Sequence, residues 1–165
     1  MLIGIISDTH DNLIKIRETV NKLNEMNVEL VLHAGDFVSP FTIKEFQKLK
    51  SRMITVFGNN DGDKSLLTQK LIQINAIVNN SFSVLDIDGL KIFLTHGDDI
   101  KAIDNIIKIN LFDLLIRGHT HKKEVKKEGK TLIINPGEVC GYLSGESTIA
   151  IFNTISKEAE IISLE

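Results

Sequence analysis

Seven polar side chains that can bind metal ions follow short apolar runs in this sequence. The runs are residues 2–6, 30–32, 53–57, 90–94 and 114–116, and the motifs after them read SDTH, HAGD, GNND, THG and GHTH. The candidate ligands in these motifs are Asp8, His10, Asp36, Asn59, His96, His119 and His121. Because ligands of open α/β sheets collect at the carboxyl ends of strands, we expect these side chains to converge on one crevice.

The donor groups restrict the metals that such a crevice would hold. Carboxylate, carboxamide and imidazole groups without a thiolate suit Mn²⁺, Fe²⁺, Ni²⁺ or Zn²⁺ better than a soft metal. Seven side chains are more than one ion needs, and they suit two ions that share a bridging carboxylate. Two ions about 3.5–4 Å apart can hold a hydroxide nucleophile and clamp the oxygens of an in-line phosphoryl displacement.

The elements that carry these motifs alternate between strand and helix in the first third of the chain. The runs 2–6, 30–32 and 53–57 have the length of buried strands. Asn12 predicts the start of one helix, and Ser39-Pro40 predicts the start of a second that contains Ile43, Phe46 and Leu49. This alternation predicts parallel strand pairing with right-handed crossovers.

The second half of the chain predicts hairpins. Asp88-Gly89 stands between apolar runs at 84–87 and 90–94, and Glu128-Gly129 stands between Val125 and the run 132–134. The remaining predictions are a helix over 100–109, a strand at 114–116, and strands at 149–152 and 159–164. Two sheets packed face to face, with helices outside, would accommodate this order as one domain over residues 1–165.

Length, charge and composition narrow the class of protein. The chain has 165 residues, 42% of them hydrophobic, and a net charge of −3, which argues against a general nucleic-acid binder. The single cysteine, Cys140, excludes an intrachain disulfide and fits a reducing compartment. The apolar start is too short for a signal peptide, and no run approaches the roughly 20 residues of a membrane span. We therefore expect a cytoplasmic protein without a membrane partner.

The ordered set DTH, GD, GNND, THG and GHTH resembles the calcineurin-like metallophosphoesterase superfamily. The nearest resemblance is to its compact single-domain phosphodiesterase branch of archaea and bacteria, and it extends to NPG at 135–137 and GYLSG at 141–145. Any one of these motifs alone would carry no weight, whereas five in the same order along the whole chain are specific. The fold that the resemblance implies is α/β with four layers, αββα: a two-sheet β-sandwich flanked by helices on both outer faces.

The resemblance also implies a role for each candidate ligand. One metal ion would be held by Asp8, His10 and His121, and the other by Asn59, His96 and His119. Asp36 would bridge the two ions and so belong to the catalytic group. The resemblance implies two divalent ions, with Mn²⁺ as the first expectation and Ni²⁺, Fe²⁺ or Zn²⁺ as alternatives.

Two positions depart from the pattern of many superfamily members. Asn60 stands where GNHD motifs have a histidine, and an amide can hydrogen-bond a phosphoryl oxygen but cannot act as a general acid near neutral pH. Asp98 stands where relatives often have the second histidine of HGH. We hypothesise that its charge penalises a dianionic monoester more than a monoanionic diester.

Other polar residues near the motifs have structural interpretations that stay open. Arg117 either contacts substrate phosphate or is a solvated loop charge. His33 is expected to be a buried, hydrogen-bonded strand residue, and Asp61 to brace its loop through backbone hydrogen bonds. Asp11 either caps a helix or assists the site.

These observations predict a metal-dependent phosphodiesterase in which a bridging hydroxide attacks a small phosphodiester in line. The alternative is a metal-binding scaffold for protein interaction with the same fold and little activity. A nuclease is a weaker third interpretation, because 165 residues leave no room for DNA-binding segments and the charge is acidic. A homo-oligomer is compatible with the sequence, although no apolar stripe identifies an interface.

Overall fold

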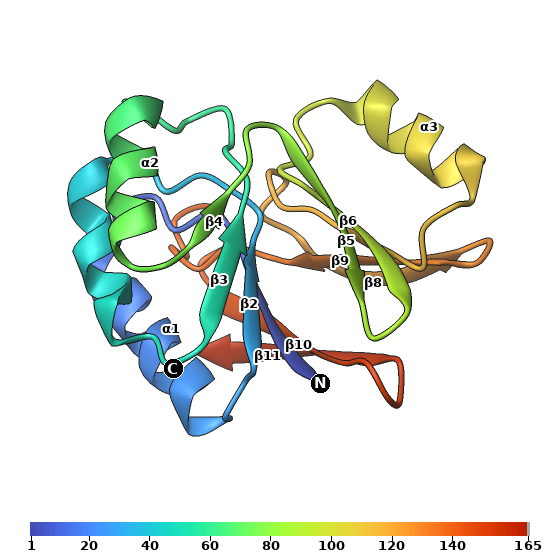
Figure 1. The fold of residues 1–165 in the computed structure, drawn as a ribbon, viewed down its shortest axis with the longest axis horizontal. Helices are drawn as coiled ribbons and strands as arrows, with labels where there is room; N and C mark the ends of the chain where they lie inside the picture. Colours follow the sequence, from blue (N-terminus) through green and yellow to red (C-terminus); the bar gives the residue numbers. More distant parts are fainter. Residues whose placement is uncertain (165) are drawn as a thin grey trace.

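The chain folds into two β-sheets that pack face to face, with helices on both outer faces (Figure 1). This computed structural model describes residues 1–164. The predicted four-layer αββα architecture is confirmed. No helix within residues 1–164 is both long and apolar enough to cross a membrane.

The first sheet has the strand order β11-β10-β1-β2-β3-β4. Its strands are β1 (Leu2–Ile6), β2 (Leu30–His33), β3 (Arg52–Thr55), β4 (Ile77–Val78), β10 (Ser147–Asn153) and β11 (Glu158–Leu164). Strands β1 to β4 are parallel, and β10 and β11 add antiparallel strands beside β1. Ile6, His33 and Thr55 lie in register, so the loops after β1, β2 and β3 leave the sheet at the same edge.

The second sheet has the order β5-β6-β7-β9-β8. Its strands are β5 (Phe82–Ile87), β6 (Leu90–Thr95), β7 (Leu114–Ile116), β8 (Lys123–Glu128) and β9 (Thr131–Pro136). The three central strands are parallel, and the hairpin partners β5 and β8 form antiparallel edges. Leu94, Ile116 and Ile134 lie in register, which aligns the loops after β6 and β7.

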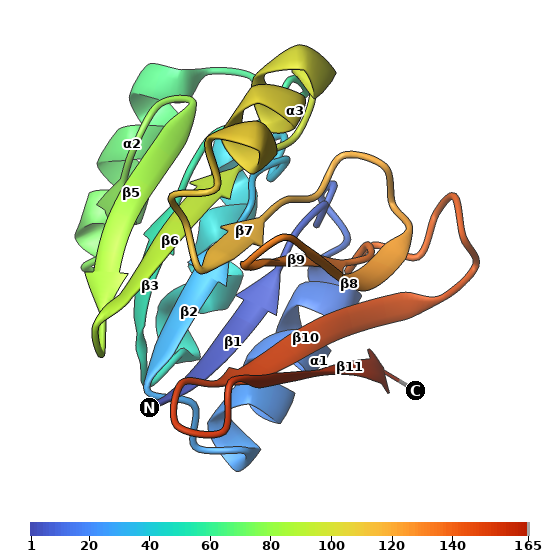
Figure 2. The same cartoon turned by 90° about the vertical axis from the view of Figure 1, so that its right-hand side faces the viewer.

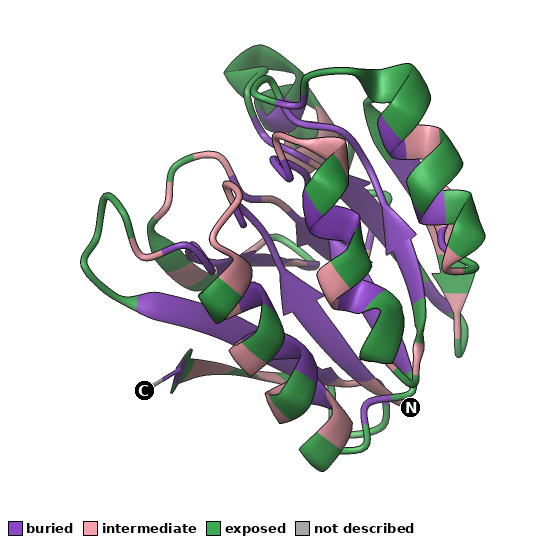
Figure 3. Ribbon diagram, turned by 90° about the vertical axis from the view of Figure 1, so that its left-hand side faces the viewer, coloured by how far each residue is buried: buried purple, intermediate pink, exposed green. Residues whose placement is uncertain are grey.

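The helices bury one face each against a sheet. The helix α1 (Leu13–Glu25), the 3₁₀ helix η1 (Pro40–Lys48) and α2 (Lys64–Gln73) cover the first sheet, and α3 (Ile100–Ile109) covers the second. Figure 3 shows that the outward faces of the helices on the first sheet are exposed while the strands behind them are buried. Asn12, Asp63 and Asp99 cap the three α-helices by accepting a backbone N–H in the first turn.

Three apolar layers separate the elements. One lies between the helices and the first sheet, around Ile16, Leu23 and Phe46. The second fills the space between the two sheets, and the third, around Phe93 and Ile103, lies under α3. The two sheets are therefore held as one packed body, which fixes the loops at their shared edge.

Several predicted elements need correction. Residues 40–48 form a 3₁₀ helix rather than an α-helix, and Ser39 does not cap it, because its hydroxyl donates to the Asp11 carboxylate at 2.6 Å. The second hairpin turns at Gly129-Lys130, since Glu128 still pairs with Thr131. Sequence periodicity predicts neither α2 nor β4. The hairpin at Asp88-Gly89 is confirmed, with both turn residues at positive φ.

Candidate metal centre

All seven candidate ligands lie at one edge of the sandwich, in loops at the carboxyl ends of parallel strands. Asp8 and His10 follow β1, Asp36 follows β2, and Asn59 follows β3. His96 follows β6, while His119 and His121 follow β7. In Figure 2 the loops after β1 and β7 approach each other across the edge of the two sheets. The structure brings these side chains together, as expected.

Asp8, His10 and His121 form one group. The Asp8 Oδ1 atom lies 3.6 Å from His10 Nε2 and 3.4 Å from His121 Nε2. Asp8 Oδ1 and His10 Nε2 are buried without a hydrogen-bond partner. Buried polar atoms that face one another without a partner are rare in folded proteins and fit a position where a cation supplies the missing contact.

Asn59, His96 and His119 form a second group. The Asn59 Oδ1 atom lies 2.9 Å from His96 Nε2 and 3.0 Å from His119 Nδ1. His96 Nδ1 lies 2.8 Å from the Ala34 carbonyl oxygen, which can only accept, so Nδ1 carries the proton of a neutral ring. The Nε2 lone pair of neutral His96 then faces the Asn59 oxygen, an arrangement suited to a shared metal ion.

Asp36 stands between the two groups. Its Oδ2 atom lies 3.4 Å from His10 Nε2 and 3.3 Å from His96 Nε2. Ligand atoms about 2.0–2.2 Å from one ion lie about 3.0–3.6 Å from each other at ordinary coordination angles. Both Asp36 separations fall in this range, and the chemistry of the donors fits a pair of divalent cations.

Without a cation, charge within the cluster is balanced by protons. Burial lowers the pKa of His96, but hydrogen bonding and attraction to Asp36 outweigh burial and raise this pKa to about 8. Burial likewise raises the pKa of Asp36, yet His96 and two Asn60 hydrogen bonds bring it well below its usual range. A carboxylate that stays charged in a buried cluster is suited to hold cations.

The backbone at these positions is unusual. Five of the seven candidate ligands have positive φ angles: Asp8, His10, Asp36, His119 and His121. A left-handed conformation at a residue other than glycine costs free energy and is concentrated at functional sites. The loops are therefore built to aim these side chains rather than to follow the easiest backbone path.

Two glycines beside the ligands are needed for space and not for turning. A Cβ atom at Gly58 would lie 2.1 Å from Asp36 Oδ1, and one at Gly118 would lie 2.6 Å from Asp8 Oδ2. Neither glycine has a positive φ angle, unlike Gly35 and Gly97. Gly58 and Gly118 let the backbone approach the two carboxylates that define the centre.

The three candidate substrate contacts differ in their surroundings. Asn60 donates through its backbone N and through Nδ2 to the two Asp36 oxygens, at 2.8 and 2.7 Å. Asp98 is exposed, two residues after His96. The Arg117 guanidinium pairs with Glu124 at 2.6 Å, so its contact with substrate stays a prediction.

The structural interpretations of His33 and Asp61 are confirmed. His33 is fully buried, stacks on Phe37 with ring centroids 3.8 Å apart, and accepts a hydrogen bond from the Gly35 backbone. Asp61 accepts four backbone N–H groups, from Asp36, Phe37, Val38 and Gly58. Asp11 accepts from the backbone N and the hydroxyl of Ser39 and caps no helix.

Glu138 is a residue next to the centre that sequence reasoning missed. Its carboxylate is fully buried and lies 2.6 Å from His121 Nδ1. Burial would raise the pKa of Glu138, but hydrogen bonds from Cys140, Ser144 and His121 lower it to about 2. The only signal in the sequence was its place after the NPG turn, within the region that carries the family resemblance.

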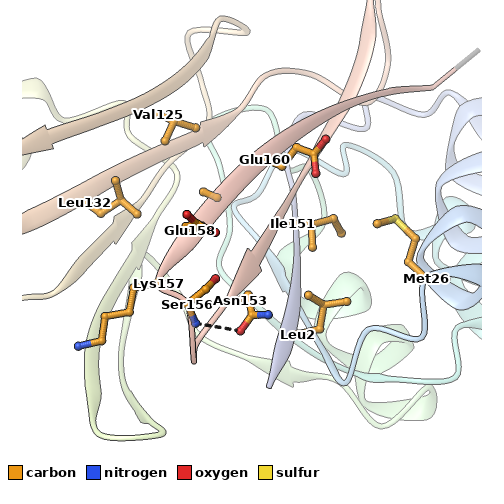
Figure 4. A pocket seen from close by; sticks show the side chains of 11 residues that line it. Leu2, Met26, Val125, Leu132, Ile151, Asn153, Ser156, Lys157, Glu158 and Glu160 are labelled. Carbon is orange, nitrogen blue, oxygen red and sulfur yellow. Dashed lines mark hydrogen bonds between the residues drawn. The ribbon is translucent and has the colours of Figure 1, made fainter.

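A hollow of about 660 Å³ lies elsewhere, along β10 and β11 (Figure 4). Leu2, Ile151 and Asn153 line it, at the amino end of β1, together with Val125 of the second sheet. None of the seven candidate ligands lines this hollow. The metal-binding chemistry of the chain is therefore separate from this pocket.

Comparison with known proteins identifies the family of the chain. Residues 1–157 match the family model of the calcineurin-like phosphoesterase superfamily domain. The chain is 47% identical to a phosphodiesterase of Methanocaldococcus jannaschii over the full length of both chains. The solved structure of an archaeal phosphodiesterase superposes with a TM-score of 0.95 at 46% identity, covering 99% of this chain and all of that one.

A more distant structure shares only the fold. Vps29 of Entamoeba histolytica, solved with zinc, superposes with a TM-score of 0.72 at 22% identity over the whole of both chains. The family model matches residues 1–157, and the likeness to the archaeal phosphodiesterase extends over the full length of both chains. The chain belongs to the calcineurin-like phosphoesterase superfamily.

Proposed function

We propose that this protein is a metal-dependent phosphodiesterase with a dinuclear centre. The observation that carries the proposal is the convergence of two groups of metal-binding side chains on Asp36, whose Oδ2 faces His10 and His96 at 3.4 and 3.3 Å. Asp8, His10 and His121 would hold one ion, and Asn59, His96 and His119 the other. The name of the Methanocaldococcus relative supports a diester rather than a monoester as substrate.

The residues of the chain would divide the work of the reaction. Bound ions would supply a hydroxide for in-line attack on phosphorus and would neutralise the charge that develops there. Asp36 would hold both ions in one geometry, and the two Asn60 hydrogen bonds would fix the orientation of the Asp36 carboxylate. Asn60 would also offer its amide to a phosphoryl oxygen when substrate displaces the contact to Asp36.

If the seven candidate ligands hold ions, none of them is free to act as a general acid for the leaving group. An amide at position 60 cannot donate a proton near neutral pH. We therefore expect faster turnover of esters whose leaving groups are stable anions. Mn²⁺ is the ion that we propose to be most effective, since the donor set mixes oxygen and imidazole ligands.

A hydrolysis assay on chelator-stripped protein tests the proposal. Bis(p-nitrophenyl) phosphate and p-nitrophenyl phosphate would each be offered with and without Mn²⁺, Ni²⁺, Fe²⁺ or Zn²⁺. We expect metal-restored cleavage of the diester. Loss of a residue that only supports a metal ligand lowers activity by about 10–100-fold. Asp36→Asn should lower the rate of diester cleavage by more than this.

Asp63→Asn is the matched control for this substitution. Asp63 caps α2 by accepting the Leu66 N–H, and asparagine caps a helix about as well as aspartate. The control should keep wild-type turnover. No turnover with any of the four ions would reject the enzyme and favour an interaction scaffold that holds metal for a partner.

A further inference from the structure

Glu138 has an environment made only of hydrogen-bond donors. The donors are His121 Nδ1 at 2.6 Å, Cys140 Sγ at 2.9 Å, Tyr142 N at 3.1 Å, Leu143 N at 2.9 Å, and Ser144 N. The Oε2 atom receives the first three and Oε1 the last two. A fully buried carboxylate with five donors is rigidly placed, because neither oxygen can move without breaking hydrogen bonds to its donors.

The contact with His121 determines which ring nitrogen carries the proton. A carboxylate only accepts hydrogen bonds, so the proton of the neutral ring must lie on Nδ1, the atom facing Glu138. The lone pair is then on Nε2, which lies 3.4 Å from Asp8 Oδ1. Glu138 therefore holds His121 in the tautomer that can bind a cation beside Asp8.

The same carboxylate also organises the loop of residues 141–145. Three successive backbone N–H groups point at it, from Tyr142, Leu143 and Ser144. The loop begins and ends at glycines with positive φ, Gly141 and Gly145, and its two apolar side chains are 63% and 76% exposed. The Glu138 carboxylate, a single buried charge, therefore sets the backbone shape of this exposed loop next to His121.

We propose that Glu138 is a positioning residue that fixes His121 for a divalent cation and couples that cation's binding to the order of the 141–145 loop. The coupling runs through one oxygen, Oε2, which accepts from both His121 Nδ1 and Tyr142 N. A cation that holds His121 in place fixes the Glu138 carboxylate, whose other hydrogen bonds hold the backbone of Tyr142, Leu143 and Ser144. The inference rests on the proposed metal centre and adds a residue and a loop to it.

Glu138→Gln probes this role with almost no change of shape. The amide nitrogen must face N–H donors on whichever side it lies. On the Oε1 side it meets two backbone donors that cannot reverse, Leu143 N and Ser144 N. On the Oε2 side it meets only one, Tyr142 N, and His121 can accept from it if the ring moves its proton to Nε2. That exchange removes the Nε2 lone pair, so we expect loss of affinity for one cation, by about 10–100-fold.

Glu146→Gln is the matched control. Glu146 follows the same loop, is exposed, and pairs with Lys123 rather than with any candidate ligand. Titration calorimetry with Mn²⁺ should give two binding events for the wild type and for Glu146→Gln. Glu138→Gln should keep one event and weaken the other, and equal affinities in Glu138→Gln and wild type would overturn the proposal.

Tyr142 supplies a second readout that does not depend on activity. It is the only tyrosine of a chain without tryptophan, so its emission reports on the loop alone. Mn²⁺ should change this emission in the wild type with the same midpoint as the calorimetric event that Glu138→Gln weakens. An emission that does not respond to Mn²⁺ would reject the coupling to the loop.

A measurement on the wild type keeps the inference testable if Glu138→Gln does not fold. Long-range ¹H–¹⁵N spectra of metal-free protein at mildly alkaline pH identify the tautomer of each histidine. We expect His121 to carry its proton on Nδ1, and a proton on Nε2 would refute the role of Glu138. If the wild type binds no cation, the proposed centre fails, and the tautomer still decides whether Glu138 sets His121.

Discussion

His33 is a buried histidine that the proposed centre does not use, and it should make the fold sensitive to acid. Burial lowers its pKa from 6.5 to about 3, because the ring packs against Phe37 away from water. Between these two pH values the unfolded chain binds a proton that the folded chain does not bind. The free energy of unfolding should therefore fall as pH drops below 6.5, by about 1.4 kcal/mol per pH unit.

Urea denaturation of metal-free protein between pH 6.5 and 5 measures this slope. The pKa values of His10 and His96 are raised in the folded chain, so these rings gain protons on acidification mainly in the unfolded chain, near pH 6.5. They oppose the slope there and contribute little to it below pH 6. His33→Gln is the comparison, because glutamine does not titrate. The variant should be less stable throughout but should lose the slope, and equal slopes in both proteins would contradict the assignment.

Asp98 tests the preference for diesters at a single exposed residue. Two unit charges about 4 Å apart in water interact by about 1 kcal/mol, which is about fivefold in a rate ratio. Asp98→Asn should raise the monoester-to-diester ratio of kcat/KM by up to that factor. Asp104→Asn, an exposed position on α3, is the control. An unchanged ratio in Asp98→Asn would reject the electrostatic argument.

The residues of the candidate site differ in how visible they are in the sequence. The seven candidate ligands stand directly after apolar runs, so their positions at strand ends could be predicted. Glu138 could not be predicted as a partner of His121, because a buried glutamate has no periodic signature and its partner is 17 residues away along the chain. Likewise, the sequence places Gly58 and Gly118 beside the ligands, but only the distances from a Cβ atom to Asp36 and Asp8 show that these positions need a glycine for space.

At the scale of elements, Asp61 connects the loop after β3 to the loop after β2. One oxygen accepts from Phe37 and Val38, at 2.7 and 2.9 Å, and the other from Asp36 and Gly58, at 3.0 and 2.7 Å. In Asp61→Asn the amide must face two buried N–H donors on one side. Each donor left unsatisfied costs about 1–3 kcal/mol, so we expect clear destabilisation in urea denaturation.

Loss of the Asp61 carboxylate should also affect the candidate metal centre, because the Asp36 backbone N–H is one of its four donors. Asp61→Asn should weaken Mn²⁺ binding as well as the fold. Asp63→Asn makes the same change two residues away, where asparagine is an equally good helix cap, and should be close to neutral. Similar stability of Asp61→Asn and Asp63→Asn would show that the two loops do not depend on the Asp61 carboxylate.

Elements were predictable where a continuous apolar run marks a buried strand, as in β1, or where apolar residues recur at helical spacing, as Ile16, Val20 and Leu23 do in α1. The helix α2 was not, because it exposes Leu66 and Ile72 while burying Leu67 and Leu71, which blurs the helical period. The strand β4 has only two residues, too few for a pattern. The 3₁₀ form of residues 40–48 has no separate signal in the sequence, and the contact of Ser39 before it is with Asp11, 28 residues away.

At the scale of the whole molecule, the two sheets meet in the apolar layer and again at the candidate centre. Asp8, Asp36 and Asn59 come from loops of the first sheet, and His96, His119 and His121 from loops of the second. The sequence predicted both sheets, but not that β10 returns to pair with β1, joining Ile3 to Phe152 across the length of the chain. Such long-range pairing depends on the packed whole, and local pattern does not encode it.

Because the proposed ligands come from both sheets, bound cations should stabilise the whole fold. A ligand at 100 times its Kd adds about 2.7 kcal/mol, and a domain of this size gains about 2–4 °C in Tm per kcal/mol. Saturating Mn²⁺ should therefore raise the Tm of stripped protein by about 5–10 °C, and chelator should reverse the shift. Differential scanning calorimetry would compare wild type, Asp36→Asn and Asp63→Asn. The shift should vanish in Asp36→Asn and persist in Asp63→Asn, whereas equal shifts in both variants would mean that Mn²⁺ stabilises the protein from somewhere other than the junction of the two sheets.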